Sequence, residues 1–434
     1  MREGYKETKL GWIPEEWVVK KFTDFASRHK KWSITGGPFG SDLKTSDYAE
    51  NGVRIIQLQN IGDGAFIDDY KIFTSIQKAD KLISSNIYPG DIILSKMGEP
   101  VARACFIPNT DNRYVMASDG IRLSIDERTF DSKFVHDYIN SSFFRKSAKK
   151  VSTGSTRQRI GLPILKKLDV ICPPLSEQKV IADCLSIWDR SIEIQTKLIK
   201  SKKERRKALM QQLLTGKIRL KGFEKEKGNH STKLGLQIPC DWKIIKVKDL
   251  FEERKETSDD QLKFPLFSLT IEKGITNKTD RYERSFLLRD QESNLYKLVY
   301  PNDIVFNPMN LRFGSIAKST LNIIVSVSAY YNSLKTKINN VDINYYEALF
   351  KTPLFINFYD RIAIGSLNEK KRVHLSNFLE LDIPYPSFEE QNAIVAILNT
   401  AEKEIKMEKL KLVDLQKQKK GLMQQLLTGK VRLV

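Results

Sequence analysis

The sequence is poor in the residues that cross-link small proteins or bind zinc. Its 434 residues include only four cysteines and four histidines. No two cysteines form a C-x-x-C pair and the histidines are equally scattered, so neither a disulfide framework nor a zinc finger is predicted. The cysteines are Cys105, Cys172, Cys184 and Cys240, and the histidines are His29, His136, His230 and His374.

Long apolar segments are also missing. No run of 18 apolar residues occurs, and the N-terminal segment has no apolar region of the kind that marks a signal peptide. We therefore expect a cytoplasmic protein without a membrane partner.

Acidic residues are scarce relative to basic ones. Lysine and arginine total 72 against 53 aspartates and glutamates, which leaves a formal charge of +19. This excess predicts a polyanionic partner, with nucleic acid the first candidate and an acidic protein surface the second. A hydrophobic content of 41% is sufficient for buried cores, and the length leaves room for about three average domains.

Internal repetition is the most informative feature that is present. The segment Leu168–Leu220 matches Leu381–Leu433 without a gap, and both contain the sequence LMQQLLTGK. The chain is therefore a variable globular domain followed by a helix, repeated once. Weaker echoes are I-P-x-x-W at 13–17 and 238–242, and Y-P-x-D-I at 88–92 and 300–304.

Each repeated segment has the pattern of a coiled-coil helix. From Ile181 to Leu213, and again from Ile394 to Leu426, mostly apolar residues recur in alternating steps of four and three. A capping box at Ser387-x-x-Glu390 predicts the start of the second helix, and Ser176 is the candidate cap of the first. The Thr-Gly pairs at 215–216 and 428–429 predict both ends, because glycine adopts the left-handed cap conformation.

The chain order favours antiparallel helices with one globular domain at each end of a rod ~58 Å long. Short strands such as Val53–Leu58, Asp91–Leu94 and Ile304–Phe306, with helices at Phe134–Lys150 and Tyr345–Asp360, predict mixed α/β domains. The expected fold is α+β, with two such domains joined by two long antiparallel coiled-coil helices and an internal pseudo-two-fold repeat. The boundaries are 1–170 and 222–383 for the domains, and 171–221 and 384–434 for the helical regions.

Several motifs, taken together and in this order, resemble the specificity subunits of type I restriction-modification enzymes over the whole chain. The helices open with PLSEQ and FEEQ, at 174–178 and 388–391, and both end in LLTGK. The first half adds GPFGS at 37–41, IIQLQNIG at 55–62, PGDIILS at 89–95 and GSTRQRI at 154–160. The second half departs from the pattern, since it has no GPFGS and carries GSLNEKKRV at 365–373.

The resemblance implies two target-recognition domains, each reading one half of a bipartite site in double-stranded DNA. The helices would dock modification (methyltransferase) subunits and, through them, restriction (translocase-endonuclease) subunits. The chain itself would be non-catalytic, with no cofactor of its own; S-adenosylmethionine, Mg and ATP would be bound only by partner subunits. Two alternatives remain open, a specificity partner of a simpler methyltransferase system and a coiled-coil adaptor that binds acidic protein.

The candidate DNA-binding residues are loop residues able to bond base edges or phosphates. Arginine can pair with guanine and glutamine with adenine, although a polar surface loop without a ligand has the same composition. In the first half they are Ser41, Lys44, Gln57, Asn60, Ser155, Thr156, Arg157, Gln158 and Arg159. In the second half they are Arg312, Ser366, Asn368, Lys370, Lys371 and Arg372.

The candidate partner-docking residues lie on the helical segments. They are Gln178, Trp188, Leu209, Leu213, Gln391, Leu422 and Leu426. The basic run from Lys197 to Lys207 is either a solvated helix face, a contact for spacer phosphates, or a site for an acidic partner.

Enzyme signatures are weak. The stretch Asn307-Pro308-Met309-Asn310 begins like the N-P-P-[FY] of amino-methyltransferases, but no F-x-G-x-G cofactor loop accompanies it. Asp303 with Glu369-x-Lys371 could be fitted to a nuclease pattern only by assuming carboxylates that converge on a metal. We therefore predict neither a catalytic residue nor a metal site.

Overall fold

Two long helices are the largest elements of the computed structural model, which describes residues 3–154, 157–224, 228–232, 235–277, 295–367 and 370–433. They are α5 (Leu175–Leu214) and α10 (Phe388–Leu426). Every predicted seam position on both helices is buried or half-buried, and from residue 402 to 418 all other positions are exposed. The coiled-coil prediction is confirmed.

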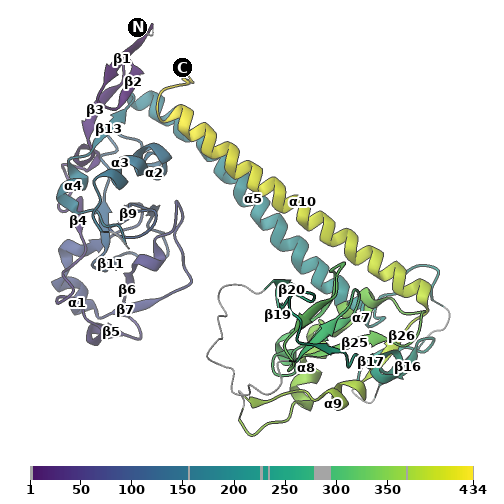
Figure 1. Ribbon diagram of the computed structural model, residues 1–434. Helices are drawn as coiled ribbons and strands as arrows, with labels where there is room; N and C mark the ends of the chain where they lie inside the picture. Colours follow the sequence, from purple (N-terminus) through teal and green to yellow (C-terminus); the bar gives the residue numbers. More distant parts are fainter. Residues whose placement is uncertain are drawn as a thin grey trace. The chain divides into compact units, whose positions relative to one another are not determined.

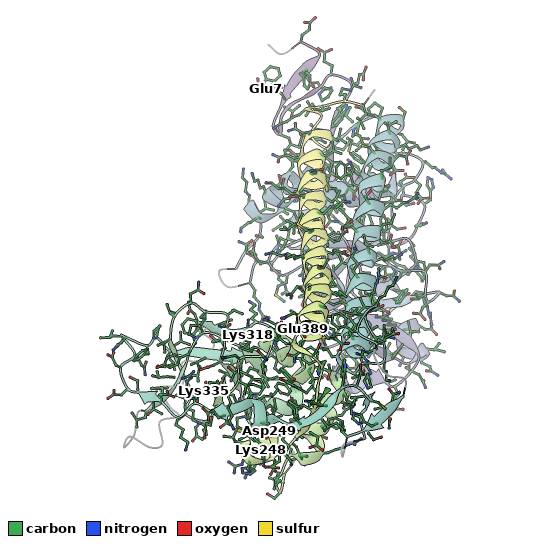
Figure 2. All side chains as sticks on the ribbon, turned by 90° about the vertical axis from the view of Figure 1, so that its right-hand side faces the viewer. Glu7, Lys248, Asp249, Lys318, Lys335 and Glu389 are labelled. Atoms are coloured by element: carbon green, nitrogen blue, oxygen red, sulfur yellow. The ribbon has the colours of Figure 1, made fainter. Side chains whose placement is uncertain are left out.

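The chain forms two units, residues 1–196 with 410–434 and residues 197–409, so each unit contains part of both helices (Figure 1). In the first unit Lys419 Nζ lies 2.5 Å from Asp189 Oδ1. In the second, Arg206 Nε lies 3.0 Å from Glu402 Oε2. Residue numbers rise along one helix as they fall along the other, so the helices are antiparallel, as predicted; Figure 2 shows them side by side from a second direction.

The first unit contains two main sheets. One is antiparallel, with the order β10-β9-β12-β4, and the other has the order β5-β7-β6-β11-β8, in which β11 and β6 are parallel. Short pairs β1-β2 and β13-β3 complete the unit. Its strands are β1 (Tyr5–Thr8), β2 (Gly11–Pro14), β3 (Val18–Lys21), β4 (Ile34–Gly36), β5 (Tyr48–Ala49), β6 (Val53–Ile56), β7 (Ile72–Thr74), β8 (Asn86–Ile87), β9 (Ile92–Ser95), β10 (Ala104–Phe106), β11 (Tyr114–Met116), β12 (Gly120–Leu123) and β13 (Asp169–Cys172). Its short helices are α1 (Ile76–Lys81), α2 (Ser132–Asn140), α3 (Ser142–Lys150) and α4 (Leu162–Lys166).

The second unit repeats the first sheet. Its order β23-β22-β25-β17 matches β10-β9-β12-β4 strand for strand, which confirms the two mixed domains and the internal repeat. The smaller sheets are β18-β21-β24, β19-β20, β16-β26 and β14-β15. The strands are β14 (Asn229–Ser231), β15 (Gln237–Pro239), β16 (Lys243–Lys246), β17 (Phe251–Glu253), β18 (Thr257–Ser258), β19 (Phe267–Thr270), β20 (Gly274–Asn277), β21 (Tyr296–Val299), β22 (Ile304–Phe306), β23 (Ile316–Lys318), β24 (Val325–Val327), β25 (Asn332–Thr336) and β26 (Asp382–Tyr385). The helices are α6 (Val247–Leu250), α7 (Ile343–Phe350), α8 (Pro353–Ile362) and α9 (Leu375–Leu379).

Two predicted helices are each broken into two. The stretch 134–150 forms α2 and α3, because Ser141 leaves the helical conformation and its hydroxyl accepts a hydrogen bond from the Phe144 amide at 3.2 Å. The stretch 345–360 forms α7 and α8, where Thr352 caps α8 in the same way. Each hydroxyl supplies an acceptor that a continuous helix would not use.

The ends of the long helices belong to the domain cores. Ile181, Leu185 and Leu426 are buried in the core of the first domain. Leu213, Ile394 and Leu398 are buried in the core of the second. Each core therefore contains the beginning of one helix and the end of the other.

A buried carboxylate at each helix start fastens the helix to a tryptophan of the same unit. Glu177 accepts a hydrogen bond from Trp17 Nε1 at 2.9 Å, and from Arg432 Nε at 3.0 Å. Hydrogen bonds to Glu177 and Glu16 raise the pKa of Arg432. Arg432, the positive partner of Glu177, is therefore 255 residues away in the sequence.

The second unit has an equivalent group of a glutamate, a tryptophan and an arginine. Glu390 accepts from Trp242 Nε1 at 2.9 Å and from Arg219 Nε at 2.8 Å. The predicted capping box is thus only half formed, because Ser387 Oγ accepts from the Glu390 amide while the Glu390 carboxylate turns to Trp242 and Arg219. The predicted Ser176 cap is wrong, because α5 already begins at Leu175.

The two domains also share a buried acid paired with an arginine. Asp91 lies 2.7 Å from Arg122 Nε, and Asp303 lies 3.0 Å from Arg254 Nη2. Asp91 and Asp303 occupy the same place in the Y-P-x-D-I motif, but Arg122 is on β12 and Arg254 follows β17. The same interaction is therefore supplied from neighbouring strands of equivalent sheets.

Candidate nucleic-acid interface

Three loops of the first domain meet at one edge of the β10-β9-β12-β4 sheet. They are the GPFGS loop after β4, residues 117–119 between β11 and β12, and the hairpin at 153–159. The Gly37 amide donates to Gly120 O at 2.9 Å, and the Lys96 amide donates to Asp119 O at 2.7 Å. Lys96 O in turn accepts from the Ile160 amide, directly after the hairpin, at 2.9 Å. These backbone bonds connect the three loops although they are far apart in the sequence.

Gly37 allows the first two loops to approach closely. A β-carbon at this position would lie 1.8 Å from the carbonyl oxygen of Ala117, well inside van der Waals contact. Any other residue would push the loops apart. The GPFGS motif is therefore a packing requirement at this position.

The hairpin carries the predicted arginines. Thr153 and Arg159 exchange backbone hydrogen bonds of 2.9 and 2.8 Å, and the Gly98 amide donates to Gln158 O at 3.1 Å. Arg157 and Arg159 are exposed, and Gln158 is half-buried. Ser155 and Thr156 lie outside the described residues.

A charged group that the sequence did not reveal lies under these loops. Lys96 Nζ donates to Ser118 O at 2.7 Å, and Arg159 forms an ion pair with Asp119. Burial lowers the pKa of Lys96, while the charge of Asp119 opposes that shift. Lys96 directly follows the PGDIILS strand, but only the fold brings it to Asp119.

The remaining candidates of the first domain are spread around this edge. Gln57 donates to the Tyr48 hydroxyl at 3.0 Å and lines a hollow of about 250 Å³ with Phe39 and Asp119. Ser41 and Lys44 are exposed. Ser41 lines a second hollow of about 600 Å³, which Phe39 also borders.

One predicted DNA contact is wrong, and another has a partner within its own domain. Asn60 is completely buried, and its amide nitrogen donates to the carbonyls of Ile67 and Tyr70 at 3.0 and 2.9 Å, so no donor remains for DNA. The Arg312 side chain is 9% exposed and lies 3.3 Å from Asp360 of α8. Asn60 therefore stabilises the fold, while DNA contact by Arg312 stays a prediction.

The second domain builds an equivalent hairpin. Ile364 and Arg372 exchange backbone hydrogen bonds of 3.0 and 3.1 Å, and the Val373 amide donates to Pro308 O at 3.0 Å. In the first domain the Ile160 amide donates to Lys96 O at 2.9 Å, so Arg372 takes the place of Arg159. Ser366 and Lys370 are exposed and Lys371 is half-buried, while Asn368 lies outside the described residues.

Four of the predicted docking residues are wrong. Gln178 is buried and bonds the Asp131 amide and Pro173 O, each at 2.9 Å. Gln391 is buried and bonds the Asp342 amide and Pro386 O in the same way, at 2.9 and 3.0 Å. Leu213 and Leu426 lie in the two cores. None of these four side chains is available to another subunit.

Other helix residues are available. Trp188, Leu209 and Leu422 are half-buried on the seam, and their role in docking stays a prediction. The pattern analysis missed Ile187 and Ile194, which are 67% and 59% exposed and lie seven residues apart on one face of α5. Their seven-residue spacing, off the seam, was the signal that could have revealed them.

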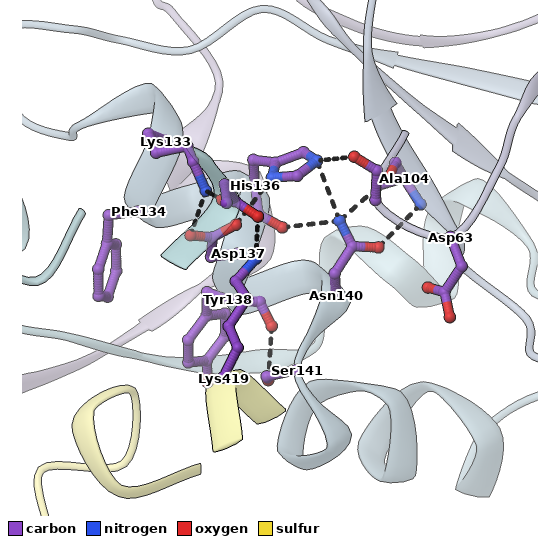
Figure 3. A network of polar contacts seen from close by, with 12 residues as sticks. Asp63, Ala104, Lys133, Phe134, His136, Asp137, Tyr138, Asn140, Ser141 and Lys419 are labelled. Carbon is purple, nitrogen blue, oxygen red and sulfur yellow. Dashed lines mark hydrogen bonds and ion pairs between the residues drawn. The ribbon is translucent and has the colours of Figure 1, made fainter. Parts of the chain in front are cut away.

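A buried histidine network connects α2 with the loop that carries Gly64 (Figure 3). His136 Nδ1 lies 3.0 Å from Asp137 Oδ1, and its Nε2 lies 3.1 Å from Gly64 O. Lys133 donates to Asp137 at 2.5 Å, and Asn140 donates to Ala104 O at 3.0 Å. The Asn140 amide nitrogen also lies 3.2 Å from Nε2, so both ring nitrogens have partners inside the protein. The network therefore stabilises packing and presents no group to a substrate.

The part of the chain that the structure describes has neither a metal-binding cluster nor a membrane-spanning helix. No group of three or more histidine, cysteine, aspartate or glutamate side chains there is placed to hold a metal ion. Among the same residues, no helix is both long and apolar enough to span a bilayer.

Comparison with known proteins gives concordant matches. Residues 14–202 and 239–417 match the family model described as the type I restriction modification DNA specificity domain. The putative type I restriction enzyme MjaX specificity subunit of Methanocaldococcus jannaschii is 23% identical over 453 residues, covering 99% of this chain and 97% of that protein. The type I restriction enzyme MjaVIII specificity subunit of the same organism is 27% identical over 225 residues, so this chain matches only 51% of that relative's length.

A solved structure is also similar. It is described as the structural basis underlying complex assembly and conformational transition of the type I R-M system, and it aligns with a TM-score of 0.59. The match covers 96% of this chain and 99% of that one at 12% identity. At that identity the likeness concerns the fold.

Proposed function

The chain belongs to the family of type I restriction-modification DNA specificity proteins, and we propose that each of its two domains reads one half of a bipartite site in double-stranded DNA. The observation that carries this proposal is the repeated loop edge. Equivalent hairpins place Arg159 and Arg372 at the same position of two equivalent sheets. Arginines exposed on loops that a rigid sheet positions are suited to base edges and phosphates.

The overall charge supports the same ligand. A formal charge of +19 attracts a polyanion, and neutralising phosphates releases counterions, so affinity for DNA should fall steeply with salt. The compartment that holds DNA is then the expected location, which is the cytoplasm.

We further propose that methyltransferase subunits dock on the coiled coil. Ile187 and Ile194 form an exposed apolar pair on α5 that the partner helix does not cover. Burial of such a pair is favourable by ~1.5–3 kcal/mol for each side chain. Translocase-endonuclease subunits would join through the methyltransferase subunits, and S-adenosylmethionine, Mg and ATP would be bound by these partners.

The chain is proposed to position this chemistry without performing it. The purified chain should therefore transfer no methyl group from S-adenosylmethionine and cut no DNA, while the assembled complex methylates the site. Methyl transfer by the chain with partner subunits demonstrably absent would overturn this part of the proposal.

The test of sequence reading uses Arg157→Ala and Arg372→Ala in the assembled complex. If each arginine reads a base, its loss costs ~1–3 kcal/mol and relaxes one half-site only, and the two variants affect opposite halves. If it holds a phosphate, binding to all sequences weakens alike and the salt dependence becomes shallower. The measurement is methylation sequencing combined with affinity at several salt concentrations.

The matched control is Lys21→Ala, which removes the same charge from an exposed residue of β3. It should leave the recognised bases unchanged. Loss of discrimination in both halves from Arg157→Ala alone would contradict independent reading by the two domains.

A further inference from the structure

Phe39 is held at the tip of the GPFGS loop with most of its ring in solvent. Its side chain is 82% exposed, although the preceding Pro38 is buried. The Asp42 amide donates to Phe39 O at 2.9 Å, which closes a tight turn directly after the ring. The loop base is fixed by Gly37 against Ala117, so the ring is presented on a rigid support.

The surroundings of this ring are polar and concave. The ring borders the hollow of about 250 Å³ with Tyr48, Gln57 and Asp119. It also borders the hollow of about 600 Å³, whose lining includes Lys78 and Lys81. An apolar ring between amide, acid and basic side chains matches a ligand with a flat apolar face, polar edges and negative charge.

A single exposed aromatic residue is ordinary on a protein surface. The second domain, however, exposes Tyr330 to the same extent, 82%, at the corresponding edge of its sheet. Leu123 pairs with Ile92 in the first domain, and Leu334 pairs with Ile304 in the second. Counting back four residues from each leucine, Tyr330 takes the position of Asp119.

The two rings therefore come from neighbouring positions of equivalent sheets. Phe39 follows β4, while Tyr330 precedes β25, the equivalent of the strand adjacent to β4. In the first domain Asp119 lines the hollow beside Phe39 and pairs with Arg159. Tyr330 takes the position of this acid in the domain that has no GPFGS loop and whose equivalent hairpin carries Arg372.

We infer that Phe39 and Tyr330 are base-contacting wedges, each of which inserts its ring against a base step of one half-site and partly unstacks it. Apolar side chains that enter between bases lose water from the ring and gain stacking area, which compensates the cost of unstacking. The flanking arginines then hold the phosphates or base edges of the distorted step. This inference rests on the proposed function and adds residues that specify DNA by deformation as well as by hydrogen bonds.

The experiment uses the chain assembled with methyltransferase subunits and a duplex carrying the methylated motif found by sequencing. 2-Aminopurine replaces one base at a time in both half-sites, and its fluorescence rises where a base is unstacked. With the unaltered protein we expect one responsive position in each half-site. Phe39→Ala should abolish the response in one half and weaken binding at least about tenfold, and Tyr330→Ala should do so in the other.

Two controls separate this effect from misfolding. Tyr330→Phe keeps the ring and should keep the response. Trp12→Ala removes an exposed aromatic residue from β2, beside Thr428 and Lys430, and should change affinity less than about twofold. Because Phe39 is exposed, Phe39→Ala should also leave the urea unfolding midpoint unchanged.

The outcomes distinguish the inference from the proposed function. Equal affinity and equal fluorescence for Phe39→Ala and the unaltered protein would overturn the wedge but leave sequence reading intact. An unaltered complex that binds the motif no better than a scrambled duplex would overturn the proposed function, and the wedge with it.

Discussion

Replacing Gly216 with alanine should destabilise the second unit through the end of α5. Gly216 has a φ of +69°, and a β-carbon there would lie 2.4 and 2.5 Å from the ring carbons Cδ and Cγ of Pro239, and 3.2 Å from Trp242. A proline ring is fixed to its backbone, so the strand would have to move. The I-P-x-x-W and LLTGK motifs are thus two sides of one contact.

The magnitude follows from two contributions. A non-glycine residue in the left-handed conformation costs ~1–2 kcal/mol, and overpacking a tight contact costs ~1–3 kcal/mol. We therefore expect Gly216→Ala to lower the free energy of unfolding by about 2–5 kcal/mol. Urea unfolding followed by circular dichroism measures the loss, and hydrogen exchange should locate it at β15 and β16.

Two glycines serve as controls. Gly421 lies inside α10 with no atom within 4 Å of its would-be β-carbon, so Gly421→Ala should stabilise the protein by up to ~1 kcal/mol. Gly429 repeats Gly216 in the first unit, with its would-be β-carbon 2.5 Å from Pro14. Gly429→Ala should weaken protection at β2 instead. A Gly216→Ala protein as stable as the unaltered one would refute the argument.

Three further predictions concern other parts of the chain. Exchanging Glu390 for glutamine should destabilise the second unit by ~1–3 kcal/mol, because Trp242 and Arg219 lose a charged acceptor while Arg219 keeps its ion pair with Asp241 at 2.7 Å, and urea unfolding would measure the loss. Burial raises the pKa of the Cys105 and Cys172 thiols to about 12. Under native conditions at pH 8, iodoacetamide should therefore label the exposed Cys240 first and leave Cys105 and Cys172 unmodified, which mass spectrometry would detect. Side-chain hydrogen bonds from Lys246 of β16 and Lys248 of α6 lower the pKa of Glu380 to about 2 from an ordinary 4.5. The contribution of Glu380 to stability is therefore present above pH 4.5 and is lost as the pH falls toward 2. The unfolding midpoint of Glu380→Gln should vary less with pH over that window.

Much of the architecture was predictable because it depends on repetition and periodicity. The matching segments Leu168–Leu220 and Leu381–Leu433 predicted the duplicated unit, and alternating steps of four and three predicted the seam that is buried in both helices. Such signals are local, since one helix turn determines which residues share a face. The segments that carry Arg159 and Arg372 were likewise evident in the sequence as motifs at corresponding places, and the structure shows that both form hairpins.

The roles of polar residues inside motifs were not predictable from the motifs. Gln178 and Gln391 open the helices in a pattern that suggested docking, but both are buried and bond backbone groups of their own domains. The sequence predicted Asn60 as a DNA contact, but its buried amide donates hydrogen bonds to backbone carbonyls of its own domain. A polar residue in a repeated motif looks the same in the sequence whether it binds a partner or bonds a buried backbone amide. Only its burial in the folded structure distinguishes these two roles.

The tertiary structure alone decided which residues from distant segments meet. The buried acids of the two Y-P-x-D-I motifs are paired by Arg122 in one domain and Arg254 in the other, from different strands, so aligning the repeats would leave one acid without its partner. Arg432 likewise reaches Glu177 from the end of the chain. The sequence by itself determined the repeat, the helices and the basic charge, because these follow from local pattern and composition. Packing between segments far apart in the chain decided which charges neutralise one another and which rings remain exposed. The pattern does not reveal these pairs, because an arginine that pairs with the same acid can come from either of two adjacent strands.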